Sequence, residues 1–441
     1  MPALSAIDLA MFMLESRERP FNIGPLVLLR PPQGYKGNFA DDLTAKLLKR
    51  RPGPPFSYRL SMSLTRPPSV EPIAEPDIRD HVHRLTLQRA SMDRLLEKIC
   101  ELHETQLDRS GMLWQFYVID GLDDGRVALY GKVHHGIIDG RTFVKAVTQW
   151  MSDDPKDKEV RAMWDGVERK KKAERQRAGV VQSLLDAGGQ AFGLVRSAAG
   201  VYGLLAEQGL RSAGLGKGLP LPFLNVPGAF DGKLSSQRSY AFCTLPLAEL
   251  KAAGKAHGAT VNDMLLTVLD IAMQRYLAKE RKAPREPLVA DMPVALAEGA
   301  KGGNQIAVLQ FPLGRAAASV TERMEAIRAE TGRLKDALGK RGSDTVMLYT
   351  TLVHALPLLV ERVAENVAPK LSNLLVSNPF GFAGEPYLMG AKVELALPVS
   401  VVAAGHKLNI TAVTLGPRLQ IGFLAMPDAV PHIERLARLT E

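Results

Sequence analysis

Two adjacent histidines, His134 and His135, stand with Asp139 and Gly140 in the segment HHGIIDG, and these residue types are suited to acid–base chemistry. A neutral imidazole has an unperturbed pKa of about 6.5, so at neutral pH it can accept a proton from a hydroxyl group and later return it to a leaving group. The segment therefore predicts general base catalysis at an acyl carbonyl. The alternative is structural, with both histidines beside an ordinary Asp-Gly turn.

The elements around the two histidines must place them at the end of a strand. Residues 127–133 are mostly apolar and predict a buried strand. A helix is predicted beyond the turn, because apolar side chains recur there on one helical face: Phe143, Val144, Val147 and Trp150. Neighbouring side chains of a strand point to opposite faces, so one histidine can face a cleft and the other the core. Asp139 is placed to fix the turn through backbone hydrogen bonds or to pair with an arginine, and Gly140 allows a tight exit.

Polar residues also stand at the ends of two later elements. Thr260 is placed to cap a helix whose first turn contains Asn262 and Asp263, beside the free backbone N–H groups of that helix. Residues 374–379 predict a strand ending in a turn, and Ser377 and Asn378 lie near its end. Ordinary capping and turn chemistry accounts for these residues unless the fold brings them to the histidines.

A second pair of histidines, His81 and His83, lies two residues apart in a predicted strand. That spacing puts both rings on one face, which would be half of a metal site. We favour a structural role, because no carboxylate or cysteine is spaced to complete the set.

The whole chain resembles the bacterial wax ester synthase/diacylglycerol acyltransferase family, which belongs to the CoA-dependent acyltransferase superfamily with its HHxxxDG motif. The resemblance rests on HHGIIDG, TVND at 260–263, GN at 303–304 and SN at 377–378, in that order, and on an opening helix carrying Asp8. Two departures are Met112, where the family usually has proline before Leu-Trp, and SNPFGF in place of Ser-Asn-Val-Pro-Gly-Pro.

This resemblance implies a mixed α/β fold of two chloramphenicol-acetyltransferase-like domains with an active-site tunnel between them. It implies that His135 is the general base in the transfer of a long-chain acyl group from acyl-CoA to a fatty alcohol or diacylglycerol, which gives wax ester or triacylglycerol. His134, Asp139 and Gly140 would support the loop. The candidates for the oxyanion site or tunnel wall are Asn262, Asp263, Ser377 and Asn378. Acyl-CoA is then a substrate, and we expect no metal or redox cofactor.

We predict three parts in the chain: an N-terminal acyltransferase-like domain at 1–152, a charged linker and connecting helix at 153–232, and a C-terminal acyltransferase-like domain at 233–441. The runs DDPKDKEV and ERKKKAERQRAG predict a solvated linker or exposed helix. The helix predicted over 180–210 is made of small and apolar residues. It either packs between the domains, which we favour, or lies on anionic lipid.

The composition of the chain indicates its cellular compartment and the class of partner it can bind. The chain has 441 residues, of which 46% are hydrophobic and 23% charged, so it can bury a full core. The formal net charge of +9 favours anionic partners, but no nucleic-acid-binding module is recognisable, so nucleic acid is not expected. Only two cysteines occur, Cys100 and Cys243, which indicates a reducing cytoplasm. We see no signal peptide or membrane-spanning stretch, so any association with the inner membrane or with lipid inclusions would be peripheral.

Two other functions remain as alternatives. A condensation-type acyltransferase would take its acyl group from a carrier-protein thioester, but no carrier domain is present. A non-catalytic, peripheral lipid-binding protein would keep the fold and lose turnover, but His135 and Asp139 are intact.

Overall fold

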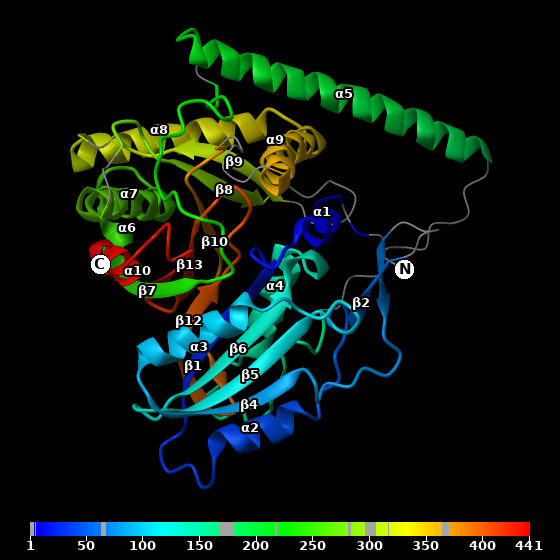
Figure 1. Cartoon of the computed structure of the whole chain (residues 1–441), viewed down its shortest axis with the longest axis vertical. Coiled ribbons are helices and arrows are strands. Elements are labelled where there is room, and N and C mark those ends of the chain that lie inside the picture. The colour runs from blue at the N-terminus through cyan, green and yellow to red at the C-terminus, as the bar shows by residue number, and fades with distance from the viewer. Residues whose placement is uncertain are drawn as a thin grey trace.

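The computed structural model of the chain describes residues 4, 6–62, 68–167, 180–216, 218–280, 284–295, 306–315, 317–363 and 370–441. Two six-stranded sheets organise these residues, and helices cover them (Figure 1). The predicted GN segment at 303–304 and the basic run at 168–179 lie outside the described residues.

The first sheet has the strand order β11-β12-β1-β6-β5-β4. Its neighbours pair antiparallel except β4 and β5, which are parallel. The strands are β1 (Asn22–Arg30), β4 (Val82–Ala90), β5 (Trp114–Leu122), β6 (Val127–His134), β11 (Tyr387–Leu388) and β12 (Ala391–Val399). The accompanying elements are α1 (Ala6–Leu14), α2 (Phe39–Leu47), the hairpin β2 (Tyr58–Ser61) with β3 (Ser69–Pro72), α3 (Met92–Glu104), the 3-10 turn η1 (His135–Ile137) and α4 (Gly140–Trp150).

The second sheet has the order β7-β14-β13-β10-β8-β9, in which β10 runs parallel to both of its neighbours. The strands are β7 (Ser239–Pro246), β8 (Val289–Ala295), β9 (Ile306–Pro312), β10 (Leu374–Phe382), β13 (Leu408–Leu415) and β14 (Arg418–Ala425). The helices are α5 (Val180–Ser212), α6 (Leu247–Ala256), α7 (Val261–Glu280), α8 (Val320–Gly339), α9 (Ser343–Val363) and α10 (Ile433–Thr440). Both sheets are mixed and flanked by helices, so the predicted α/β class is confirmed.

The two sheets share one core, and a late segment of the chain adds a strand to the first sheet. β12 pairs with β1 in the first sheet, although it lies between β10 and β13 of the second sheet in sequence. The largest hydrophobic cluster contains Leu28 of β1, Leu397 of β12 and Phe423 of β14. We placed all of 233–441 in a C-terminal domain, whereas the fold gives β11 and β12 to the first sheet. The two sheets are therefore not built from the two halves of the chain on either side of residue 232. The division into domains at that residue stays a prediction.

Strand β6, which leads to the histidine pair, is buried along its whole length. It lies between β1 and β5, and both of its faces are covered. A strand covered on both faces requires a continuous apolar run, which the sequence from Val127 to Val133 provides apart from Lys132. The prediction of a buried strand that ends at the histidines is confirmed.

The predicted linker was wrong for residues 160–167, because these residues belong to the core of the first sheet. Trp164 is fully buried, and its ring stacks on Trp114 with a centroid distance of 4.8 Å. Val160, Met163 and Val167 are buried with it. The surrounding charges masked this apolar group in the sequence. Burial and stacking of the indole stabilise the fold, while the neighbouring Arg161 and Asp165 side chains keep contact with solvent.

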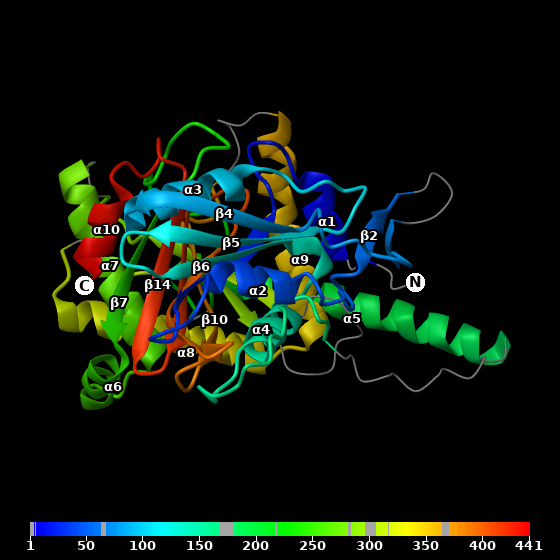
Figure 2. The same cartoon turned by 90° about the horizontal axis from the view of Figure 1, so that it is seen from below.

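Helix α5 packs on α9 through Val201 and Leu204, which join a small hydrophobic cluster with Tyr349 of α9. These side chains agree with a helix packed on the protein, whereas its predicted position between the domains stays a prediction. Tyr202 and Leu205 of the same helix stay exposed. One end of α5 extends beyond the rest of the molecule (Figures 1 and 2).

Strand β10 continues beyond the turn that we predicted at Pro379. It runs on to Phe382, with an irregular register against β13 between Ser377 and Phe380. A proline has no N–H to donate to the ladder, so a bulge in the strand is the expected response. Helix α9 likewise continues through Pro357.

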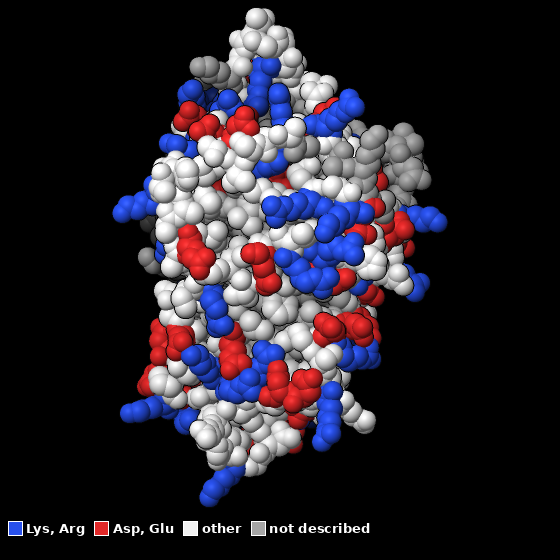
Figure 3. All heavy atoms as spheres, turned by 90° about the vertical axis from the view of Figure 1, so that its left-hand side faces the viewer, with Lys and Arg blue, Asp and Glu red and all other residues white. Residues whose placement is uncertain are grey.

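Charge is distributed over the surface without a single basic patch on the face that Figure 3 shows. Lys and Arg side chains alternate there with Asp and Glu side chains (Figure 3). The net charge of +9 is therefore not concentrated on this face as a nucleic-acid-binding stripe would require.

Candidate active site

The histidine pair lies where β6 ends and η1 begins, next to α1. Asp139 then caps α4: its Oδ1 accepts a hydrogen bond from the Thr142 backbone N–H at 2.9 Å, and its Oδ2 accepts one from the Thr142 hydroxyl at 2.8 Å. The predicted fixing of the turn by Asp139 through the backbone is thus observed. Gly140 is the first residue of α4. Both residues therefore shape the turn between the histidines and α4.

His134 is fully buried and held on three sides. Its Nδ1 accepts a hydrogen bond from the Gly136 N–H at 3.0 Å, so the neutral ring carries its proton on Nε2. That Nε2 lies 3.6 Å from the Glu15 carboxylate. The ring stacks on Phe12 with a centroid distance of 4.1 Å and an interplanar angle of 2°. His134 is therefore the histidine that faces the core.

Gly136 makes this packing possible. A Cβ at this position would lie 2.7 Å from the Phe12 ring and 3.1 Å from Nδ1 of His134. Such contacts are closer than carbon atoms normally approach, so any larger residue would push the His134 ring out of its stack.

His135 remains half-buried, and its backbone N–H donates to the Phe21 carbonyl at 2.7 Å. Its Nδ1 is buried and has no hydrogen-bond partner among the described residues, so we expect a substrate to approach Nε2. Burial lowers the pKa of His135, and this outweighs the opposite effects of its own carbonyl and of the Asp8 and Asp139 carboxylates. The ring is consequently neutral at pH 7 and able to accept a proton.

Sequence reasoning missed several residues around the pair, above all Glu15 and its partner Arg109, which form an ion pair at 2.8 Å. It also missed Lys132, whose Nζ donates to the carbonyls of Leu102 and Thr105 at 2.8 and 3.0 Å. Burial lowers the pKa of Lys132 to about 8, although Glu15 opposes this. In the sequence, a lysine inside an otherwise apolar strand could have indicated these buried polar contacts.

The TVND segment forms a reciprocal cap at the start of α7. Thr260 N–H donates to Oδ2 of Asp263 at 2.8 Å, and Asp263 N–H donates to the Thr260 hydroxyl at 3.2 Å. Oδ1 of Asp263 accepts from Thr331 of α8 at 2.7 Å. Burial would raise the pKa of Asp263, but these bonds lower it, so the group is a carboxylate that accepts and does not donate. This geometry argues against Asp263 as an oxyanion donor, while Asn262 is half-buried and keeps a donor amide.

The Ser-Asn pair of β10 lies in the strand that α4 contacts, so the fold brings it toward the histidine loop. The Ser377 hydroxyl shares a hydrogen bond of 2.9 Å with Thr411. Asn378 is exposed. Of these two residues, Asn378 has the side chain that is more available to a ligand.

His81 and His83 have structural surroundings. Nδ1 of His81 lies 2.7 Å from the Trp114 carbonyl, and the His83 ring stacks on Tyr117. In the described part of the chain, no group of three or more His, Cys, Asp or Glu side chains has an arrangement that could hold a metal ion.

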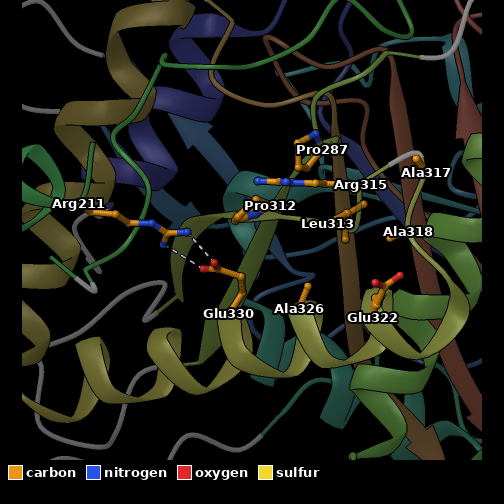
Figure 4. A pocket seen from close by; sticks show the side chains of 10 residues that line it. All are labelled: Arg211, Pro287, Pro312, Leu313, Arg315, Ala317, Ala318, Glu322, Ala326 and Glu330. Carbon is orange, nitrogen blue, oxygen red and sulfur yellow. Dashed lines mark hydrogen bonds and ion pairs between the residues drawn. The ribbon is translucent and has the colours of Figure 1, made fainter. Parts of the chain in front are cut away.

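A separate cavity of about 510 Å³ lies between β9 and α8 (Figure 4). Four charged side chains line it, namely Arg211, Arg315, Glu322 and Glu330. Arg211 is paired with Glu330 at 2.5 Å, so much of the positive charge is already neutralised. None of the residues of the histidine loop lines this cavity.

Two family models match the chain. The wax ester synthase/diacylglycerol acyltransferase catalytic domain covers residues 4–265, and the C-terminal domain of the same family covers residues 302–441. The chain is also 32% identical to a protein of Mycobacterium tuberculosis named as a probable diacylglycerol O-acyltransferase, Tgs4, across 100% of this chain and 95% of that protein. A second such protein of the same organism, Tgs2, is 31% identical across 97% of this chain and 95% of its own length.

Solved structures show the same fold. A wax ester synthase/diacylglycerol acyltransferase from Marinobacter aquaeolei matches 100% of this chain and 97% of its own, with a TM-score of 0.73 and 22% identity. The first condensation domain of the calcium-dependent antibiotic synthetase matches 99% of this chain and 95% of its own, with a TM-score of 0.55 and 16% identity. At these identities the likeness concerns the fold alone.

Proposed function

The chain belongs to the wax ester synthase/diacylglycerol acyltransferase family, and we propose that it transfers a long-chain acyl group from acyl-CoA to a fatty alcohol or diacylglycerol with His135 as the general base. It is an acyltransferase whose product is wax ester or triacylglycerol. The observation that supports the assignment of the base is the neutral, half-buried ring of His135 directly after β6, with Nδ1 buried.

The proposed reaction has two proton transfers. Nε2 of His135 removes the hydroxyl proton of the acceptor while the oxygen attacks the thioester carbonyl carbon. The tetrahedral intermediate then collapses, the C–S bond breaks, and the CoA thiolate takes the proton back from the His135 imidazolium. Both steps use the same nitrogen, so the enzyme ends in its starting state.

The intermediate needs hydrogen-bond donors for its oxyanion. Each donor in a dry site lowers the barrier by about 2.7–4 kcal/mol. We propose the amide of Asn378 first, because it lies on the strand beside α4, and that of Asn262 second. In this proposal His134, Asp139 and Gly140 hold the loop, Ser377 supports Asn378, and the substrates meet in a tunnel between the two sheets.

Acceptor-dependent release of CoA thiol tests this function. Palmitoyl-CoA is given to the protein with hexadecanol or with diacylglycerol in parallel, and the lipid products are identified by chromatography. We expect thiol release to rise well above background with at least one acceptor, and the faster acceptor names the main product. Release that no alcohol stimulates, but that an acylated carrier protein supports, would instead favour the condensation-type alternative.

We further propose a cytoplasmic protein that binds the inner membrane or lipid inclusions peripherally through α5. Support comes from four exposed apolar side chains on or just beyond this helix, Tyr202, Leu205, Leu210 and Leu215, of which Tyr202 is 79% exposed. Among the described residues, no helix combines the length and the apolar character needed to cross a bilayer.

Flotation with phosphatidylglycerol vesicles tests the role of α5. The double exchange Tyr202→Asp with Leu215→Asp is expected to lower the partition coefficient onto the vesicles at least about a hundredfold, since burying each such side chain contributes roughly 1.5–3 kcal/mol. Leu48→Asp is the control, because this exposed residue ends α2 at the opposite end of the molecule (Figure 1). Equal binding of the double variant and the wild type would remove α5 from the proposal.

A further inference from the structure

We propose that Glu15 is a positioning residue that holds both histidines of the catalytic loop, one through each oxygen of its carboxylate. The inference rests on the proposed role of His135 as the general base. Glu15 directly follows α1, and its side chain is only 1% exposed. A carboxylate buried to this degree needs partners for both oxygens.

The first oxygen reaches the backbone of His135 through one intermediate residue. Oε1 of Glu15 accepts a hydrogen bond from the Phe21 N–H at 3.0 Å. The Phe21 carbonyl in turn accepts the His135 N–H at 2.7 Å. Phe21 precedes β1, so the carboxylate fixes the chain at the point where β1 meets the catalytic loop. A shift of Glu15 would therefore move the backbone that carries the base.

The second oxygen faces the ring of His134. Since Nδ1 of His134 accepts from Gly136, its proton is on Nε2, and this N–H points to Oε2 of Glu15 across 3.6 Å. The distance is longer than a hydrogen bond, so the attraction is electrostatic. It selects the tautomer that lets Nδ1 accept from the Gly136 N–H and so hold the turn directly after His135.

Arg109 keeps the carboxylate in place and charged. Its Nη2 lies 2.8 Å from Oε2 of Glu15 and donates to the Phe12 carbonyl at 2.8 Å, so the guanidinium joins the end of α1 to the site. Burial raises the pKa of Glu15, but the electrostatic attraction of His134 and the hydrogen bonds from Arg109 and Phe21 outweigh it and leave the pKa below its ordinary value. The carboxylate is thus ionised throughout the working pH range.

The test compares Glu15→Gln with the wild type in acceptor-dependent thiol release, with rates corrected for the folded fraction by circular dichroism. Glutamine keeps the shape of the side chain, but its amide has no charge to pair with Arg109. Its NH2 group would also face a neighbouring N–H donor that now binds a carboxylate oxygen. We expect kcat to fall about tenfold to a hundredfold, as for a base misplaced by about 1 Å, with KM changed less than about twofold. Glu97→Gln, on an exposed side chain of α3, is the matched control and should equal the wild type.

A double-mutant cycle separates positioning from a merely structural role. In the His135→Ala background, Glu15→Gln should cause no further fall in kcat, because the residue acts through the base. A wild-type kcat for Glu15→Gln, or a full additional loss in the His135→Ala background, would overturn the proposal. If Glu15→Gln does not fold, Arg109→Gln loosens the same carboxylate from a more exposed position and should lower kcat severalfold, and an unchanged kcat would overturn it equally.

The proposal and the function fail in different ways. If His135→Ala keeps full activity, the base assignment itself is wrong, whatever Glu15 does. If His135→Ala loses activity while Glu15→Gln does not, the function stands and only the positioning role is lost.

Discussion

Replacing His135 with alanine is expected to lower kcat for acyl transfer by about two to four orders of magnitude, the range that a positioned general base contributes. KM should change less than about threefold, because the imidazole acts on a proton and not on the acyl chain or on CoA. Thiol release from palmitoyl-CoA, measured with the preferred acceptor, gives both constants. His257→Ala, an exchange of an exposed histidine after α6, is the control.

The pH profile gives an independent readout of the same residue. Burial lowers the pKa of His135 from its ordinary value of about 6.5, so the base form predominates at neutral pH. We therefore expect kcat/KM to be level above about pH 6.5 and to fall as the pH drops through the His135 pKa. A limb above pH 7, or a limb that persists unchanged in His135→Ala, would contradict the assignment.

Removing the carboxylate of Asp291 is expected to destabilise the fold by about 3–5 kcal/mol, because it leaves a buried imidazolium without its partner. Asp291 is fully buried in β8, and its Oδ2 lies 3.4 Å from Nε2 of His354 and 3.0 Å from Nε2 of His406. Nδ1 of His354 already donates to the Thr350 carbonyl at 2.9 Å. A neutral ring would turn the lone pair of Nε2 toward the carboxylate 3.4 Å away, so the geometry favours a His354 cation.

The stability contribution of this pair should depend on pH in a defined sense. Burial lowers the pKa of His354, but Asp291 outweighs this and raises it. A raised histidine pKa stabilises the fold fully below the unfolded value of about 6.5, and this stabilisation is lost as pH rises through the folded pKa. The pKa of Asp291 is lowered despite burial, so its contribution is present above about pH 4 and disappears only in strong acid.

Urea unfolding followed by circular dichroism checks this at pH 6 and at pH 8.5 for the wild type, Asp291→Asn and His354→Gln. The difference in unfolding free energy between wild type and His354→Gln should be larger at pH 6. His257→Gln controls for the loss of one exposed histidine. A difference that is equal at both pH values would show that no ion pair is present.

The local part of the site could be predicted from the sequence. The motif HHGIIDG, the strand before it and the helix after it are consecutive in the chain, so periodicity and turn chemistry were sufficient to predict them. Thr260 and Asp263 form their cap for the same reason. Strand alternation predicted different surroundings for the two histidines; His134 is fully buried and His135 half-buried, but His135 begins a 3-10 turn and does not continue the strand.

The features that could not be predicted from the sequence depend on tertiary contacts. Glu15 meets Arg109 and His134 only after three separate elements have packed, and no spacing in the chain relates these residues. Trp164 stood among charges and was taken for linker, although one stacking contact with Trp114 buries it. Pro379 was read as the end of a strand, because a local rule cannot foresee that parallel neighbours carry β10 past a bulge.

Because β12 pairs with β1, the first sheet cannot be completed until late in the synthesis of the chain. β1 ends at Arg30 and β12 begins at Ala391, so one edge of β1 has no partner until almost the whole chain has left the ribosome. At about 5–20 residues per second, that interval lasts roughly tens of seconds. An apolar strand with an open edge invites pairing with other chains. The side of the first sheet that contains β11 and β12 is therefore completed last, and a nascent or truncated N-terminal half is the form of this protein most exposed to aggregation.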